Sequence, residues 1–275
     1  MLIFNNFLKL ITKLLITKNF NNLKNSKTCK AILFNDYISK EIIINGIYEK
    51  NECECILKKL INKNDKKKNF IDIGANLGNH SIFFSEFFNK IYAFEPNKII
   101  YSLLNFNTKE YKNIKTFNLG LSNNNNIKKI YYNNENYGGG SVFKENKSLF
   151  KNKKIFSQNI KLKKLDNIKL GKEKVAIVKI DVEGHEYEVL RGMQKILTSD
   201  SPILLIEIDN IYNQNSTRKI LNYLKKNNYL FFYEMVKKTC WPLNLILTSL
   251  KIKYIQNFKK KYYSLVICSK YKINL

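Results

Sequence analysis

Short apolar runs alternate with amphipathic stretches over most of the chain. Continuous apolar runs predict strands buried on both faces, and apolar residues at i, i+3 and i+4 predict helices between them. This alternation predicts an α/β fold with an open, mostly parallel sheet that helices cover on both faces. The predicted strands are 70–74, 91–96, 114–122, 175–181, 202–209, 229–234 and 262–269, and the helices are 79–88, 98–110, 186–197 and 216–228.

Sheets of this kind bind ligands beyond the carboxyl ends of their strands. The first predicted strand leads into DIGANLG (72–78), in which Gly74 and Gly78 permit a tight turn and close approach of a ligand. Glu95 ends the next strand, where a carboxylate can accept both ribose hydroxyls of a nucleoside. The loop has neither the G-x-G-x-x-G of dehydrogenases nor the lysine of a phosphate-binding loop, which argues against both.

The fourth of these strands runs into KIDVEGHEYE (179–188), where a basic chain concentrates acids. If the strand continues, Asp181, Glu183 and His185 alternate and share one face, although the glycine between the last two favours a turn. An imidazole titrates near neutral pH, and a neighbouring carboxylate is expected to raise its pKa. These three side chains are therefore the candidates for a general base.

Glu207 and Asp209 close the fifth strand, beside the fourth in folds of this type. With Asp181 they could supply three oxygen ligands to Mg²⁺, and the metal would lower the pKa of a bound hydroxyl. The alternative is that Glu207 lines the pocket as a hydrogen-bonding acid. A magnesium site is therefore an alternative hypothesis, and the main hypothesis for this site includes no metal.

Four motifs in this order resemble the FkbM family of S-adenosylmethionine-dependent methyltransferases: FIDIGANLGNHS, YAFEP, KLKKLD and VKIDVEGHEYEVLRGM. The resemblance covers roughly residues 46–234 and includes GIYEKNECECIL (46–57). It implies the Rossmann-like class I methyltransferase fold, with a mostly parallel seven-stranded sheet. It also implies O-methyl transfer, on a sugar hydroxyl of a surface glycan or its precursor. A small metabolite or a lipid is the alternative acceptor.

The resemblance implies cofactor contacts as well. Residues of the first loop would surround the methionine part of S-adenosylmethionine, and Glu95 would hold its ribose. The segment after the third strand would lie near the adenine, and Asp181 would lie beside the reactive methyl. The implied cofactor-binding residues are Asp72, Gly74, Asn76, Gly78, Glu95, Leu121 and Ser122. For the Asn76 amide, capping of the next helix is an equal alternative.

The net charge of +26 raises a second class of function, a non-catalytic nucleic-acid-binding protein. Of the 48 basic residues only Arg191 and Arg218 are arginines, the side chain that reads bases by paired hydrogen bonds. We therefore expect no specific nucleic-acid partner. The five cysteines lack zinc or redox spacing, which favours reduced thiols and a cytoplasmic protein.

Residues 1–45 are predicted to be a helical extension, and 46–275 a methyltransferase domain with an insertion near 235–261. In residues 1–20, apolar positions form a helical stripe flanked by lysines. This helix would either dock on the body or lie on the inner face of the membrane. The glycine-rich segment 136–141 is expected to be a turn, either on the surface or acting as a lid over the acceptor.

Overall fold

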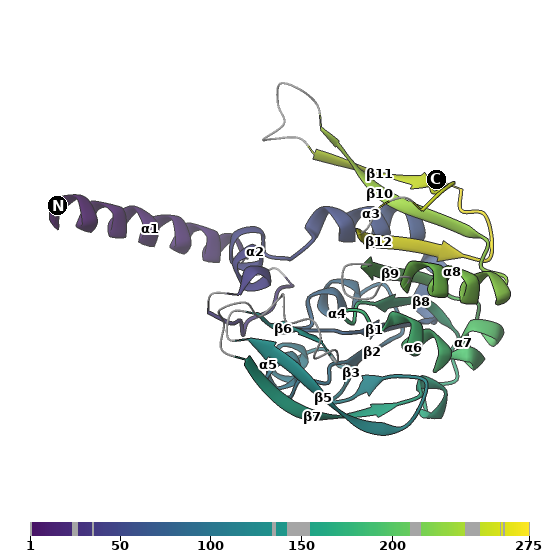
Figure 1. Ribbon diagram of the computed structural model, residues 1–275. Helices are drawn as coiled ribbons and strands as arrows, with labels where there is room; N and C mark the ends of the chain where they lie inside the picture. The colour runs from purple at the N-terminus through teal and green to yellow at the C-terminus, as the bar shows by residue number, and fades with distance from the viewer. Residues whose placement is uncertain are drawn as a thin grey trace.

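Figure 1 shows the chain as a computed structural model that describes residues 2–23, 27–34, 36–133, 136–141, 155–209, 216–239, 248–258, 260 and 262–274. Some side chains within these ranges, those of residues 136–141 and Asp209 among them, lie outside the description. A large central sheet carries helices on both faces, and a smaller sheet lies near one edge. Helix α1 projects away from the body (Figure 1).

The main sheet has eight strands in the order β11-β10-β12-β9-β8-β1-β2-β3. Strands β3, β2, β1, β8 and β9 pair in parallel, whereas β12 pairs antiparallel with β9 and β10, and β11 antiparallel with β10. The strands are β1 (Asn69–Ile73), β2 (Lys90–Phe94), β3 (Ile114–Phe117), β8 (Val175–Ile180), β9 (Ile203–Asp209), β10 (Phe231–Thr239), β11 (Thr248–Tyr254) and β12 (Tyr262–Ser269).

This sheet confirms the predicted doubly wound α/β fold, with one difference in its strand count. The sequence predicted seven strands, and the eighth is β11 at the edge. It comes from the segment 235–261 that was expected to be an insertion, and it pairs with an extended β10. An exposed sheet edge accepts a further strand readily because its backbone groups are unpaired. The division of the chain at residue 45 stays a prediction.

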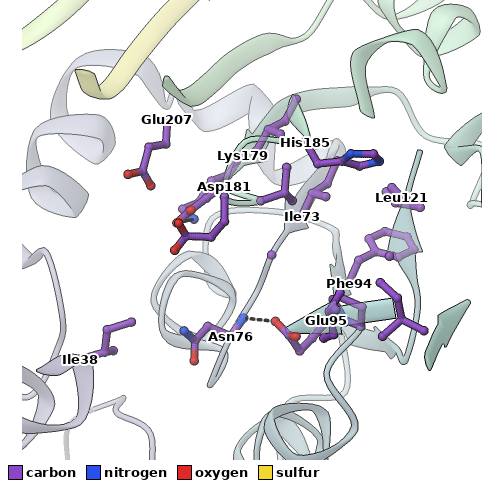
Figure 2. Close-up of a pocket in the computed structure, with 18 of the residues that line it drawn as sticks. Ile38, Ile73, Asn76, Phe94, Glu95, Leu121, Lys179, Asp181, His185 and Glu207 are labelled. Atoms are coloured by element: carbon purple, nitrogen blue, oxygen red, sulfur yellow. Dashed lines mark hydrogen bonds and ion pairs between the residues drawn. The ribbon is translucent and has the colours of Figure 1, made fainter. Parts of the chain in front are cut away.

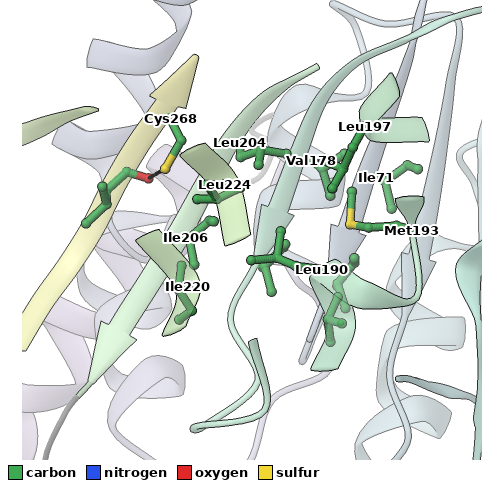
Figure 3. Packing of buried hydrophobic residues seen from close by; sticks show 14 of the residues in the cluster. Ile71, Val178, Leu190, Met193, Leu197, Leu204, Ile206, Ile220, Leu224 and Cys268 are labelled. Carbon is green, nitrogen blue, oxygen red and sulfur yellow. Dashed lines mark hydrogen bonds between the residues drawn. The ribbon is translucent and has the colours of Figure 1, made fainter. Parts of the chain in front are cut away.

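The helices are α1 (Leu2–Leu23), α2 (Tyr37–Asn45), α3 (Lys50–Leu60), α4 (Asn79–Phe84), α5 (Lys98–Thr108), α6 (Glu186–Arg191), α7 (Gln194–Ser199) and α8 (Ser216–Lys226). Helices α6, α7 and α8 pack on one face of the sheet, where Leu190, Met193 and Leu224 join the largest cluster of buried apolar side chains (Figure 3). Helices α3 and α4 contribute to a second cluster on the other face. Alternate residues of the strands supply the two clusters.

The predicted helix over 186–197 is broken between α6 and α7. A Cβ atom on Gly192 would lie 2.0 Å from the carbonyl oxygen of Ser122, so the two backbones touch at this point. The pattern of apolar residues spans the break because both short helices bury the same face. The break therefore reflects a long-range contact that helical periodicity does not encode.

A second sheet of four strands, in the order β4-β7-β5-β6, was not predicted. Residues 120–121, expected within the third strand, form the separate strand β4, and the glycine-rich 136–141 forms β6 rather than a turn. The strands are β4 (Gly120–Leu121), β5 (Asn126–Asn133), β6 (Asn136–Ser141) and β7 (Ile155–Lys163). The alternation that marks such strands is interrupted by the exposed Ile127 in β5 and by Gln158, which faces inward in β7.

The end of β1 meets the end of β8 at Gly74. A Cβ atom there would lie 1.8 Å from the carbonyl oxygen of Asp181, and the backbone has a φ of +79°, which favours glycine. The Asp181 N–H donates to the carbonyl oxygen of Ile73 at 3.1 Å. Only glycine therefore lets the first loop turn away while the two strand ends remain paired.

We predict that Gly74→Ala lowers the free energy of unfolding by at least about 2 kcal/mol, because the new methyl group meets backbone and the φ is strained. Gly171→Ala is the matched control, since its Cβ meets the flexible Glu173 carboxylate and the Tyr92 hydroxyl instead of backbone. Urea unfolding of both variants measures the effect. Equal stability of the two would contradict the close approach at Gly74.

Candidate active site

A cavity of about 320 Å³ lies at the carboxyl ends of β1, β2, β8 and β9 (Figure 2). Ligand pockets in proteins begin at roughly this size, about 300 Å³. The strand ends contribute Gly74, Glu95, Asp181 and Glu207 to its lining. The cavity therefore lies at the edge where the sequence predicts a ligand.

The first loop shapes one wall of the cavity, but only part of it faces the interior. Gly74 and Asn76 line the cavity. Asp72 and Gly78 do not: Asp72 is fully buried and accepts a 2.6 Å hydrogen bond from the Ser81 hydroxyl, and Gly78 precedes α4. Asp72 and Gly78 therefore help to hold the loop in its shape. Direct contact of either residue with the cofactor stays a prediction.

Glu95 joins the first loop to the end of β2. Its Oε2 accepts the backbone N–H of Asn76 at 3.1 Å, and its Oε1 accepts that of Asn97 at 2.8 Å (Figure 2). Burial raises the pKa of this carboxyl to about 7, and repulsion from Asp181 adds to the effect. A carboxylate has about four lone-pair sites, so two remain for a ligand in the cavity.

Apolar side chains from both sheets form the far wall of the cavity. Leu121 of β4 lines the cavity, whereas the buried Ser122 does not, and contact of either residue with the cofactor stays a prediction. The other apolar lining residues on this side are Phe94, Leu119, Ile130, Ile160 and Leu162. The second sheet thus supplies an apolar surface that suits a flat ring system such as a purine.

Asp181, Glu183 and His185 all line the cavity, although a turn rather than an extended strand gathers them. Strand β8 ends at Ile180, and the chain then turns through Glu183 and Gly184, whose φ angles are 52° and 95°. The strand does not continue, and the turn that the sequence suggested at Gly184 is present instead of the alternation. The acids that follow begin α6, as the sequence predicted.

His185 differs from its predicted state. Burial, together with repulsion from Lys128, lowers its pKa to about 4, so the expected increase from a carboxylate neighbour is wrong. Its Nε2 atom lies 3.0 Å from the Ser122 hydroxyl, on the Leu121 side of the cavity (Figure 2). The neutral imidazole therefore belongs to the wall formed with the second sheet, away from the acids of β8 and β9.

Asp181 forms an ion pair with Lys179, two residues earlier on β8. The Lys179 Nζ lies 2.9 Å from Oδ2 of Asp181, and the lysine is buried whereas the Asp181 side chain is 35% exposed. Burial favours the neutral forms of both groups, but the charges and hydrogen bonds around them outweigh it together. Lys179 and a hydrogen bond from Glu207 lower the pKa of Asp181, and Asp181 with other nearby acids raises the pKa of Lys179. Asp181 is therefore an ionised carboxylate that faces the cavity.

Glu207 carries a proton at neutral pH. Burial and the neighbouring charge of Asp181 raise its pKa to about 10. Its carboxyl group makes side-chain hydrogen bonds with Asp181 and with Tyr262. The cavity thus presents a carboxylate, a neutral carboxyl group and a phenol side by side.

The magnesium alternative gains no support from this arrangement. Among the residues that the structure describes, no group of three or more histidines, cysteines and acids is placed to hold a metal ion. The Asp209 side chain lies outside those residues. At Asp181 the ammonium group of Lys179 already supplies the positive charge that a metal would bring.

Sequence reasoning missed the part of the cavity that precedes the first strand. Glu49 lines the cavity in a left-handed conformation, with a φ of 54°, and its Oε2 lies 3.2 Å from Nε2 of His80. Burial opposes a charge on His80, but contacts with Cys53 and Glu49 outweigh it and raise the histidine pKa to about 10. Tyr48 also lines the cavity. The motif GIYEKNECECIL contains both Tyr48 and Glu49 and could have indicated this part of the cavity, but no role was assigned to it from the sequence.

The start of α2 also reaches the cavity, through Asp36, Tyr37 and Ile38. The Asp36 carboxylate caps α2 by accepting the backbone N–H of Ser39 at 2.9 Å. Cys29 and Ile42 of the same region pack against Leu77 beside the first loop. Residues before position 46 therefore help to build the cavity, which no motif in that stretch indicated.

Comparisons with known proteins agree with this geometry. The profile of the Methyltransferase FkbM domain matches residues 72–231, more than half of the chain. No curated protein matches the chain in sequence. A methyltransferase FkbM from Methylobacillus flagellatus KT is similar in structure, with 14% identity and a TM-score of 0.45. That match covers 74% of this chain and 44% of the other, so this chain spans less than half of that protein's length.

A precorrin-6y C5,15-methyltransferase from Geobacter metallireducens GS-15 is also similar, with 15% identity and a TM-score of 0.45 over 82% of this chain and 93% of the other. The strand order, with β12 antiparallel between β9 and β10, is that of the Rossmann-like class I methyltransferase sheet with β11 added at its edge. By the match of its profile, the chain belongs to the FkbM methyltransferase family.

Proposed function

We propose that the protein transfers the methyl group of S-adenosylmethionine to a hydroxyl group, and that the acceptor is a sugar of a surface glycan or of its precursor. The family supports methyl transfer. The observation that carries the hydroxyl acceptor is the pairing of ionised Asp181 with protonated Glu207 in the cavity. A carboxylate can take a proton, and the neutral carboxyl and phenol beside it can hold neighbouring hydroxyl groups.

The residues present fit the cofactor. Glu95 keeps two lone-pair sites for the ribose hydroxyls, and the apolar wall around Leu121 suits the adenine. Gly74 and Asn76 would border the methionine part. When bound, S-adenosylmethionine supplies a methyl group on a positively charged sulfur, which is a good leaving group.

In this mechanism Asp181 orients the acceptor hydroxyl and accepts its proton, and bound S-adenosylmethionine would supply the methyl group to the hydroxyl oxygen with its sulfur as the leaving group. A positioned base contributes roughly 10²–10⁴-fold to such a rate. Lys179 holds Asp181 in its ionised form, and Glu207 donates to Asp181 and keeps it oriented. Tyr262 and Glu207 also align the acceptor hydroxyl, which raises the rate of transfer further.

The first prediction concerns cofactor binding. S-Adenosylhomocysteine is expected to raise the melting temperature of the wild-type protein, and Glu95→Ala is expected to abolish the shift. Glu110→Ala is the matched control because Glu110 is exposed and pairs with Lys30 on the surface. Differential scanning fluorimetry measures all three. A full shift in Glu95→Ala would overturn the assignment of the ribose site.

The second prediction follows from the pKa of Glu95, which lies at about 7 in the free protein. The ionised carboxylate accepts hydrogen bonds from hydroxyls, and the neutral form predominates below pH 7. The Kd of S-adenosylhomocysteine is therefore expected to rise as the pH falls from 8 to 6, by at most about tenfold per unit for one linked proton. Titration calorimetry measures this slope. Glu95→Gln should bind more weakly and show no such slope.

The third prediction distinguishes the proposed roles of Asp181 and Glu207 in methyl transfer. Asp181→Asn is expected to lower the rate of transfer roughly 10²–10⁴-fold, while the thermal shift with S-adenosylhomocysteine persists. Glu207→Gln keeps a hydrogen-bond donor in place of the protonated carboxyl and is expected to stay within about tenfold of the wild type. The assay follows labelled methyl from S-adenosylmethionine into glycans extracted from a strain that lacks the gene. Transfer into lipids that carry no sugar would instead exclude the sugar acceptor.

A further inference from the structure

Helix α1 exposes nearly all of its described apolar side chains to solvent. Phe4, Phe7, Leu14 and Leu15 are 63%, 57%, 61% and 63% exposed, and the helix projects from the body (Figure 1). Leaving such side chains in water forgoes the favourable free energy that their burial would provide. A stretch of this kind marks a surface for another molecule.

The apolar side chains within residues 4–15 share one face of α1. At 3.6 residues per turn, Phe4, Phe7, Leu8, Leu10, Ile11, Leu14 and Leu15 form one continuous stripe. Asn5, Lys9, Thr12 and Lys13 lie on the opposite face, and all four are exposed. The first four turns are therefore an amphipathic helix with a basic polar face.

The positive charge of the amino-terminal region indicates which kind of partner α1 binds. The first 35 residues contain six lysines and no acid, within a chain of net charge +26. Two copies of this chain would bring like charges together, which opposes pairing through α1. An anionic lipid surface attracts the lysines and buries the apolar stripe. None of the helices in the described ranges combines the length and apolar character needed to cross a membrane.

The end of α1 leads through a short segment to the start of α2, which borders the cavity. Tyr37 is 66% exposed and also lines the cavity, together with Asp36 and Ile38. Phe34, between the two helices, is 93% exposed. A surface bound by α1 would thus lie near the α2 side of the cavity mouth.

We propose that α1 binds the surface of an anionic phospholipid membrane in the plane of the interface. Its apolar stripe lies in the acyl boundary, and Lys9 and Lys13 lie among the headgroups. This docking places the α2 side of the cavity at the membrane surface, where an acceptor carried by a lipid or assembled there can reach it. The proposal does not depend on the reaction that the cavity performs.

Co-sedimentation of the full chain with vesicles tests the proposal. The wild type is expected to bind vesicles of phosphatidylglycerol and phosphatidylcholine, and to bind pure phosphatidylcholine at least about tenfold more weakly. Leu8→Gln combined with Leu14→Gln should lower binding to the anionic vesicles at least about tenfold. Thr12→Gln combined with Thr17→Gln is the matched control, with the same new residues at polar positions, and should stay within about twofold.

All variants should keep the melting temperature of the wild type, which separates loss of docking from loss of fold. Lys9→Gln combined with Lys13→Gln should reduce the preference for anionic vesicles. Equal binding by the two double Gln variants, or equal binding to both kinds of vesicle, would overturn the proposal. The wild type could instead fail to bind vesicles and form a dimer in light scattering that the leucine substitutions dissociate. That result would show that the partner of α1 is a second copy of the chain and not a lipid surface.

Discussion

The site depends on the contact between the ends of β1 and β8, where Gly74 leaves no room for a side chain against the carbonyl of Asp181. This contact lets the first loop and the acidic turn start from the same point. The loop then carries Asn76 to Glu95, and the turn carries Glu183 and His185 into the same cavity. A bulkier residue would separate the two strand ends, and with them the groups proposed to bind the cofactor and the acceptor.

Charge is distributed within the cavity by burial and pairing. Lys179 keeps Asp181 ionised, and the charge on Asp181 in turn keeps a proton on Glu207. His80 balances Glu49 in the same way on the side that precedes the first strand. Glu49 and Asp181 therefore each have a cation beside them, and a carboxylate exists next to the neutral carboxyl group of Glu207. Such environments, which move the pKa values of similar groups apart, are characteristic of sites that handle protons.

The second sheet gives the cavity its apolar wall and also restrains His185. Its first strand leads into Ser122, whose backbone packs against Gly192 and whose hydroxyl contacts the imidazole. The break between α6 and α7 allows this approach. The histidine that follows the acids in sequence consequently lies with the second sheet, and burial there keeps it neutral. For this reason the proposed mechanism gives proton transfer to Asp181 rather than to His185.

The sequence by itself determined seven of the eight strands of the main sheet, the glycine loop and the acids at the strand ends. Apolar runs, glycines such as Gly74 and strand-terminal acids such as Glu95 are local features, and parallel strands carry their ends to one edge. Only the tertiary structure decided that Asp72 is buried away from the cavity, that His185 is neutral, that Glu207 keeps its proton and that Glu49 reaches the site. These properties depend on burial and on partners far along the chain, and no pattern of neighbouring residues records such partners.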